Sequence, residues 1–211
     1  MVKKGLFVCF EGPDGSGKGT ILSKISNHIF NNFKEIDSIF ITREPTYSEY
    51  GKQIRQLLRK DKDPLTHSKQ LLQLYIDDRK EHLNKSIRPL LSKKTLILCD
   101  RYKYSTIVYQ QAQGIPAEKI ISLHSKMLVP DIVFILDVDV KTAMKRIRGD
   151  RGLIEKFEKD YFLDELRQYY IDLPKQLPEE NIKIIDATKE PEEVLEQILK
   201  ELEPLLRDLA K

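Results

Sequence analysis

The amino-acid sequence predicts a three-layer α/β fold, in which helices cover both faces of a five-stranded, mostly parallel sheet. Two observations carry this prediction: short apolar runs rich in β-branched and aromatic residues, and segments with helical spacing between them. Strands that alternate with helices form βαβ units, whose sheets are covered on both faces. The segments expected as strands are Leu6–Phe10, Ser38–Thr42, Leu96–Cys99, Ile132–Leu136 and Ile182–Ile185.

Apolar residues at helical spacing mark the helices between and after these strands. The last helix is entered through Glu190, Pro191 and Glu192, and both proline and carboxylates favour a first helical turn. No repeat or linker divides the sequence, so residues 1–211 are expected to form one domain. Three apolar helix faces are expected: Ile21, Leu22, Ile25 and Ile29; Leu71, Leu72, Tyr75 and Leu83; and Val194, Leu195, Ile198, Leu199 and Leu202.

Composition and charge restrict the class of protein. A chain of 211 residues, 40% of them hydrophobic, can bury a substantial core. Its net charge of +3 argues against a protein that coats a nucleic acid polymer. No apolar stretch approaches the ~18 residues needed to cross a bilayer, and Cys9 and Cys99 fit buried, reduced thiols. We therefore expect a cytoplasmic protein that binds neither nucleic acid polymers nor membranes.

A glycine-rich loop joins the first expected strand to the first expected helix. Residues 12–18 read Gly-Pro-Asp-Gly-Ser-Gly-Lys, which fits the G-x-x-x-x-G-K pattern of a P-loop. Its glycines let successive backbone N–H groups face one phosphate, and the helix N-terminus adds partial positive charge. Lys18 is expected to reach the β- and γ-phosphates of ATP. The residues expected at the ATP site are Gly12, Asp14, Gly15, Ser16, Gly17, Lys18, Gly19 and Thr20.

The metal site predicted from the sequence departs from most P-loops. Gly19 stands where a serine or threonine hydroxyl usually binds Mg²⁺, in a Gly-Lys-Gly-Thr run that looks like adenylate kinase. The metal would then depend on phosphates, waters and a carboxylate elsewhere. Asp100 ends an apolar strand and is predicted to hold Mg²⁺ or its waters. Asp137 also ends a strand and is expected to have mainly a structural role.

An arginine-rich stretch at about residues 146–158 is expected to follow a helix, because it interrupts the apolar pattern. Its position alone allows two interpretations, a solvated surface loop or a short basic lid over phosphates. The stretch contains Arg146, Arg148 and Arg151.

Further segments follow the P-loop in a specific order. They are Thr42-Arg43-Glu44-Pro45; Asp100-Arg101-Tyr102 with Ser105-Thr106 and Tyr109-Gln110; and Phe157-Glu158, Phe162, Arg167 and Tyr170. This combination resembles the thymidylate kinase family of P-loop nucleoside monophosphate kinases, from Leu6 to about Asp186. The resemblance implies phosphoryl transfer from ATP to dTMP with Mg²⁺, giving dTDP and ADP in dTTP biosynthesis. It also suggests a homodimer.

The resemblance implies roles for individual residues around the acceptor. Arg43 and Arg101 would contact the acceptor phosphate, since a guanidinium can bind phosphate oxygens bidentately. Tyr75 would stack on the pyrimidine, and Arg79, one helical turn later, would donate to a ring carbonyl. Asp14 would approach the sugar 3′-hydroxyl or brace the loop.

Other implied contacts involve the sugar, the base and the transferring phosphate. Ser105 and Thr106 lie where the family contacts the base, and Tyr109 lies where an aromatic ring favours deoxyribose. Gly15 replaces the P-loop arginine of many eukaryotic members, whereas bacterial-like members carry arginines in the lid. One or more of Arg146, Arg148 and Arg151 would then stabilise the transferring phosphate and exclude water.

Alternatives to thymidylate kinase activity stay open at this point. Gly19 and the pair Thr46-Tyr47, which replaces a common Gly-Gly, leave room for another or a broader nucleoside monophosphate kinase. A deoxynucleoside kinase is a further possibility, but Arg43 and Arg101 favour an acceptor that already carries a phosphate. A nucleotide-binding module without kinase activity is the third. The sequence has no Asn-Lys-x-Asp motif of a GTPase.

Overall fold

The computed structural model describes residues 4–60, 63, 65–151 and 160–211. Its strands form one parallel sheet in the order β2-β3-β1-β4-β5. They are β1 (Leu6–Glu11), β2 (Ser38–Arg43), β3 (Thr95–Asp100), β4 (Ile132–Asp137) and β5 (Ile182–Asp186). All five predicted strands are confirmed, and each extends one residue further at its carboxyl end than predicted. The added residue is charged in every strand. The strands are longer than predicted because the sheet pairing continues beyond the apolar runs on which the prediction rested.

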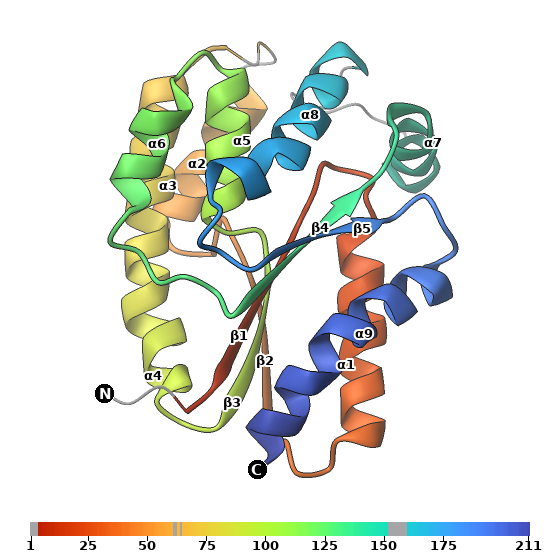
Figure 1. The fold of residues 1–211 in the computed structure, drawn as a ribbon. Helices are drawn as coiled ribbons and strands as arrows, with labels where there is room; N and C mark the ends of the chain where they lie inside the picture. The colour runs from red at the N-terminus through yellow and green to blue at the C-terminus, as the bar shows by residue number, and fades with distance from the viewer. Residues whose placement is uncertain (1–3, 61–62, 64, 152–159) are drawn as a thin grey trace.

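Helices cover both faces of the sheet, as predicted (Figure 1). α1 (Lys18–Asn32) and α9 (Pro191–Ala210) lie on one face, where their apolar residues pack together. The helices of the opposite face contribute to a second apolar cluster. They are α2 (Glu49–Lys60), α3 (Ser68–His82), the π-helical turn η1 (Leu83–Ile87), α4 (Arg88–Leu91), α5 (Lys103–Ala112), α6 (Ala117–His124), α7 (Val140–Arg151) and α8 (Asp160–Gln176).

The central strand β1 supplies both apolar clusters. Successive side chains of a strand point to opposite faces of the sheet. Phe7 and Cys9 therefore pack beneath α5 and α8, whereas Val8 and Phe10 pack against α1 and α9. Cys9 and its register partner Cys99 on β3 are buried free thiols, as expected.

Parallel strands bring charged residues to one edge of the sheet, because their carboxyl ends all meet there. Asp100 of β3 pairs in register with Arg43 of β2 on one side and with Phe10 of β1 on the other. The P-loop leaves β1 at Gly12, and the segment containing Arg101 leaves β3 directly beside it. The fold thus places the predicted ATP site and the predicted acceptor site next to each other.

The expectation that the basic stretch follows a helix is wrong for its first part. Residues 146–151 continue α7, which is capped at its start by Asp139. The Asp139 carboxylate accepts hydrogen bonds from the backbone N–H of Thr142 at 2.9 Å and from its hydroxyl at 2.8 Å. Residues 152–158 of the predicted lid lie outside the described residues. Among the described helices, none is long and apolar enough to cross a membrane.

The packing of α9 on the sheet can be tested by shortening one buried side chain. Leu202 is fully buried in the cluster between α1, α9 and the sheet, whereas Leu205 is only partly buried. We expect Leu202→Ala to lower the free energy of unfolding by about 2–5 kcal/mol, because it leaves a cavity in the core. Urea titration measures this loss, and Leu205→Ala should lower the free energy of unfolding clearly less. Equal losses in the two variants would contradict this packing.

Candidate active site

The P-loop runs from the end of β1 to the first residue of α1, where the sequence places it. Gly12 has a backbone φ of 136°, and a Cβ there would lie 2.7 Å from the carbonyl oxygen of Leu136. A Cβ on Gly15, whose φ is 77°, would lie 2.5 Å from the carbonyl oxygen of Ala143. Both glycines are therefore required by conformation and by space. Ser16 is buried beneath the loop, while Gly19 and Thr20 are exposed on α1.

Lys18 lies folded over the P-loop. Its ammonium group donates hydrogen bonds to the carbonyl oxygens of Gly12 and Pro13, each at 3.0 Å. Burial lowers the pKa of the Lys18 ammonium to about 8, and the nearby charge of Arg101 acts in the same direction. Carboxylates including Asp100 act in the opposite direction, so the side chain is mostly cationic at neutral pH.

Arg101 joins the P-loop to two helices of the opposite layer. Its backbone has a left-handed φ of 67°, which turns the guanidinium back toward the loop. Nη1 donates to the carbonyl oxygen of Gly12 at 3.0 Å, to the Ser105 hydroxyl at 3.1 Å and to the Tyr170 hydroxyl at 3.2 Å. Nη2 pairs with the carboxylate of Asp14 at 2.7 Å. These contacts show that the predicted residues Asp14, Arg101 and Ser105 meet in one place.

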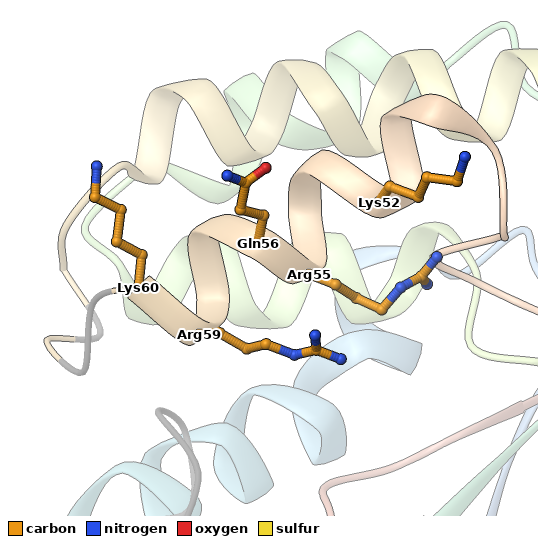
Figure 2. A pocket seen from close by; sticks show the side chains of 5 residues that line it. All are labelled: Lys52, Arg55, Gln56, Arg59 and Lys60. Atoms are coloured by element: carbon orange, nitrogen blue, oxygen red, sulfur yellow. The ribbon is translucent and has the colours of Figure 1, made fainter.

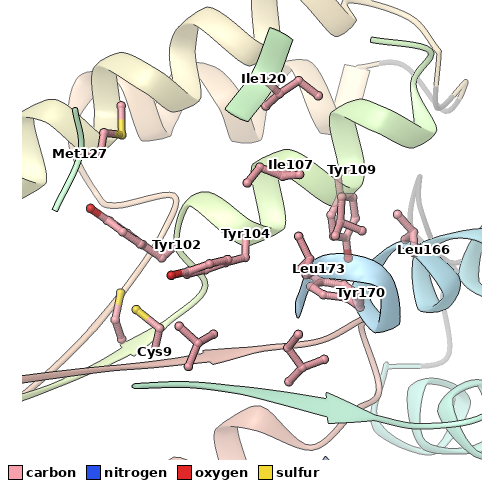
Figure 3. Close-up of a cluster of buried hydrophobic side chains, with 14 of the residues drawn as sticks. Cys9, Tyr102, Tyr104, Ile107, Tyr109, Ile120, Met127, Leu166, Tyr170 and Leu173 are labelled. Atoms are coloured by element: carbon pink, nitrogen blue, oxygen red, sulfur yellow. The ribbon is translucent and has the colours of Figure 1, made fainter. Parts of the chain in front are cut away.

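Aromatic rings border this guanidinium. The Tyr109 ring lies 5.3 Å from the Arg101 guanidinium carbon, within cation–π range. Figure 3 shows Tyr109 of α5 pointing toward Tyr170 of α8. Tyr75 of α3 is half-buried, and burial raises the pKa of its hydroxyl to about 12, against the opposing charges of Arg101 and Arg79. Both predicted aromatic contacts to the substrate therefore lie within electrostatic reach of Arg101.

Glu11 is a site residue that the sequence did not reveal. Its side chain is 0% exposed, and it accepts hydrogen bonds from the backbone N–H of Tyr102 at 2.7 Å, from the Ser105 hydroxyl, and from the Tyr170 hydroxyl at 3.4 Å. Burial raises the pKa of the Glu11 carboxyl to about 7, although the Ser105 hydrogen bond and the Arg101 charge oppose this rise. An acidic residue that ends a buried strand directly before a P-loop was the available signal.

Asp100 fits the predicted role of a metal ligand. Its Oδ1 atom is buried and has no hydrogen-bond partner among the described residues. Carboxylate oxygens are the ligands that Mg²⁺ prefers, together with phosphate oxygens and water. Within the described part of the chain, no three acidic, histidine or cysteine residues cluster as a metal site. Arg43, its register neighbour, is exposed, and its side chain forms no hydrogen bond or ion pair with another described residue.

Arg79 occupies a buried polar network instead of an open surface. The side chain is 1% exposed. Its Nε atom donates to Glu44 at 2.7 Å, Nη1 donates to Nε2 of His124 at 2.7 Å, and Nη2 donates to the Thr106 hydroxyl at 2.9 Å. His82 joins the same network through Glu44 at 3.0 Å. The structure thus brings Arg79 and Thr106 together, while the two histidines were not found from the sequence.

The loop after β2 departs from the common Gly-Gly pattern, and Asp78 of α3 holds it in place. The Asp78 carboxylate accepts hydrogen bonds from the backbone N–H of Thr46 at 2.8 Å and from the Ser48 hydroxyl at 2.5 Å. Arg55 of α2 donates to the carbonyl oxygens of Pro45 and Thr46 at 3.1 and 2.7 Å. Partly buried hydrogen bonds from α2 and α3 therefore hold this loop in its shape.

A basic cavity of about 450 Å³ lies on α2 beside this loop. Figure 2 shows that its five lining side chains all come from one face of the helix. Four of them are cationic, and a concentration of positive charge attracts anions such as nucleotides. The lining residues are Lys52, Arg55, Gln56, Arg59 and Lys60.

The arginines of the predicted lid differ in their positions. Arg146 Nη1 donates to the carbonyl oxygens of Gly15 at 3.4 Å and Ala187 at 3.0 Å, so this residue touches the P-loop. Arg148 is exposed on α7. Arg151 ends α7, and its side chain lies outside the described residues.

Comparison with known proteins agrees with this geometry. The profile of the family described as thymidylate kinase matches residues 10–198. The chain belongs to the thymidylate kinase family. The thymidylate kinase of Brachyspira hyodysenteriae is 38% identical over 198 residues, covering 93% of this chain and 92% of the relative. The probable thymidylate kinase of Thermococcus kodakarensis is 36% identical, covering 95% and 98%, and the thymidylate kinase of Desulfotalea psychrophila is 33% identical, covering 96% of each.

Membership in the thymidylate kinase family confirms the resemblance that the motifs indicate. The Asp100-Arg101-Tyr102 segment spans the end of β3 and the turn into α5. Asp100 ends β3 in register with Phe10 of β1, whereas the Arg101 side chain donates to the Gly12 carbonyl oxygen of the P-loop.

The raised pKa of Glu11 predicts a pH-dependent stability. A carboxyl group whose pKa is higher in the folded state stabilises the fold when protonated, and this contribution is lost as pH rises through about 7. Relative to Glu11→Gln, the wild-type free energy of unfolding should therefore fall between pH 5 and pH 8, by as much as about 3 kcal/mol.

Urea unfolding at several pH values measures this difference. Glu193→Gln, which changes an exposed carboxylate on α9, is the matched control and should follow the wild type throughout. A constant difference between wild type and Glu11→Gln over this range would show that Glu11 does not titrate as described.

Proposed function

We propose that the protein transfers the γ-phosphoryl group of ATP to the 5′-phosphate of dTMP, giving dTDP and ADP in dTTP biosynthesis. Membership in the thymidylate kinase family supports this substrate pair. The observation that carries the proposal is the contact of Arg101 with both the Gly12 carbonyl and Asp14 of the P-loop. An arginine in that position can bind an acceptor phosphate next to the phosphates of ATP.

The chemistry requires positioning and charge neutralisation more than proton transfer. An oxygen of the acceptor phosphate forms a bond to the γ-phosphorus, the bond from that phosphorus to the β–γ bridging oxygen breaks, and ADP leaves with the electron pair. The acceptor is already an anion, so no strong general base is needed. Lys18, Arg43 and Arg101 would neutralise the phosphates, with Arg148 and Arg151 as further catalytic candidates from the lid.

Asp100 would hold the Mg²⁺ ion or its waters in this proposal. The buried and unpartnered Oδ1 atom of Asp100 supports the assignment. A bound Mg²⁺ would supply positive charge against the negative charge that develops on the phosphates during transfer. The backbone of residues 12–20, including Gly15, Ser16, Gly17, Gly19 and Thr20, would surround the ATP phosphates.

The acceptor nucleoside would lie between α3 and α5. Tyr75 would stack on the pyrimidine, Arg79 and Thr106 would recognise its edge, and Tyr109 would favour deoxyribose. The hydrogen bond of 2.9 Å between Arg79 and Thr106 supports a joint role for these two residues. The Thr46-Tyr47 loop, to which Asp78 is hydrogen-bonded, was the reason to consider a kinase with a broader range of acceptors, but the family comparison does not favour that alternative.

The proposal extends to location and assembly. We infer a cytoplasmic homodimer that acts on small nucleotides and does not bind nucleic acid polymers or membranes. The family resemblance supports the dimer, and the net charge of +3 supports the absence of a nucleic acid partner.

Substitution of the two predicted phosphate-binding cations tests the proposed function. Lys18→Ala and Arg43→Ala should each lower kcat/KM for dTMP by at least about 10³-fold, because each removes a charge next to reacting phosphates. ADP release from ATP and Mg²⁺ in the presence of dTMP measures the rate. Lys24→Ala is the control, since Lys24 lies on α1 but pairs with Glu192 at the surface. Native melting with undiminished activity in either variant would contradict its assigned role.

A further inference from the structure

Arg79 carries a positive charge that the fold has removed from water. A buried guanidinium needs a paired charge and hydrogen-bond acceptors around it. Glu44 supplies the charge through a single oxygen, Oε2, which lies 2.7 Å from both Nε and Nη2. This contact binds one edge of the guanidinium and leaves Nη1 without an acceptor from Glu44. Further partners must therefore fix its orientation.

His124 at the end of α6 supplies the contact that Glu44 lacks. Its Nε2 atom accepts a hydrogen bond of 2.7 Å from Arg79 Nη1, which is the nitrogen that Glu44 does not contact. The Tyr102 ring lies 5.0 Å from the guanidinium carbon and restricts the tilt of the plane. Together these partners hold the guanidinium in one orientation.

The chemical form of His124 is determined by its other nitrogen. Nδ1 lies 2.7 Å from the carbonyl oxygen of Ile120 and must donate to it, so Nε2 carries the lone pair that Arg79 requires. Burial lowers the pKa of the His124 imidazole to about 3, and the Arg79 charge acts in the same direction. His124 is therefore a neutral acceptor throughout the physiological pH range.

The orientation of Arg79 also determines what Thr106 can offer to a ligand. Arg79 Nη2 donates to the Thr106 hydroxyl oxygen at 2.9 Å. Because that oxygen accepts from Arg79, its own hydrogen is available to another acceptor. A ring carbonyl of a pyrimidine is such an acceptor.

We propose that His124 is a positioning residue for base recognition: it fixes the Arg79 guanidinium, and through it the Thr106 hydroxyl, to bind a carbonyl of the acceptor pyrimidine. This inference rests on the proposed function. It makes a residue of α6, remote in sequence from both site segments, a determinant of base specificity. The carbonyl at position 4 of thymine can accept hydrogen bonds from the Arg79 guanidinium and the Thr106 hydroxyl. The 4-amino group of dCMP is itself a donor and cannot accept them.

Two variants of matched chemistry test this role. In His124→Gln the amide reaches the position of Nε2 and can still accept from Arg79. In His124→Asn the amide ends near the position of Nδ1 and is too short to reach Arg79. We expect H124N to raise KM for dTMP about tenfold and to lower the preference for dTMP over dCMP in kcat/KM about tenfold. Its kcat and its KM for ATP should change less than about twofold, and H124Q should restore the wild-type preference.

The outcomes separate this inference from the proposed function. If H124N and H124Q had the same KM and kcat/KM for dTMP, His124 would have a structural role only and the inference would be overturned. The same would follow if H124N lost as much kcat/KM on dCMP as on dTMP. His124→Leu, which fills the space without an acceptor, replaces H124N if circular dichroism shows that H124N does not fold. A wild-type protein inactive on dTMP would contradict the proposed function and the inference together, whereas an active wild type with an unchanged H124N would overturn the inference alone.

Discussion

Two cations, Lys18 and Arg101, donate hydrogen bonds to the same backbone oxygen, that of Gly12, at 3.0 Å each. Like charges held this close repel, and the site compensates with carboxylates, of which Asp14 pairs directly with Arg101. The arrangement needs a glycine whose backbone tolerates a φ of 136° and whose missing Cβ leaves room for Leu136. Two cations at one oxygen suit a site that must bring two anionic phosphates together.

Glu11 connects this pair of cations to the rest of the fold. It accepts hydrogen bonds from the Ser105 and Tyr170 hydroxyl groups, and Arg101 donates to the same two hydroxyls. The end of β1, the start of α5 and the middle of α8 are thereby joined at one buried carboxylate. Loss of one partner would leave buried polar groups unsatisfied, which is costly. The position of Arg101 is therefore a property of three elements of the fold.

The sequence was sufficient for the strands and for the P-loop, because both are local patterns. Motifs of fixed spacing also marked Asp14, Arg101 and Ser105, which the structure brings into contact, and their roles stay predictions, as does that of Asp100. The sequence did not predict the network around Arg79, because Glu44 and His124 reach this residue across 35 and 45 positions of the chain. The expectation that the basic stretch follows a helix was wrong for residues 146–151, since Arg146, Arg148 and Arg151 lie within α7. Charge interrupts an apolar pattern without ending a helix.

The specificity of the acceptor site is the most direct test of the account. ADP release from ATP and Mg²⁺ should be compared for dTMP, dUMP, UMP, dCMP, AMP and thymidine at the same enzyme concentration. We expect the highest kcat/KM for dTMP and little turnover of thymidine, which has no phosphate for Arg101 to bind. Equal turnover of AMP and dTMP, or no turnover of any monophosphate, would contradict this expectation.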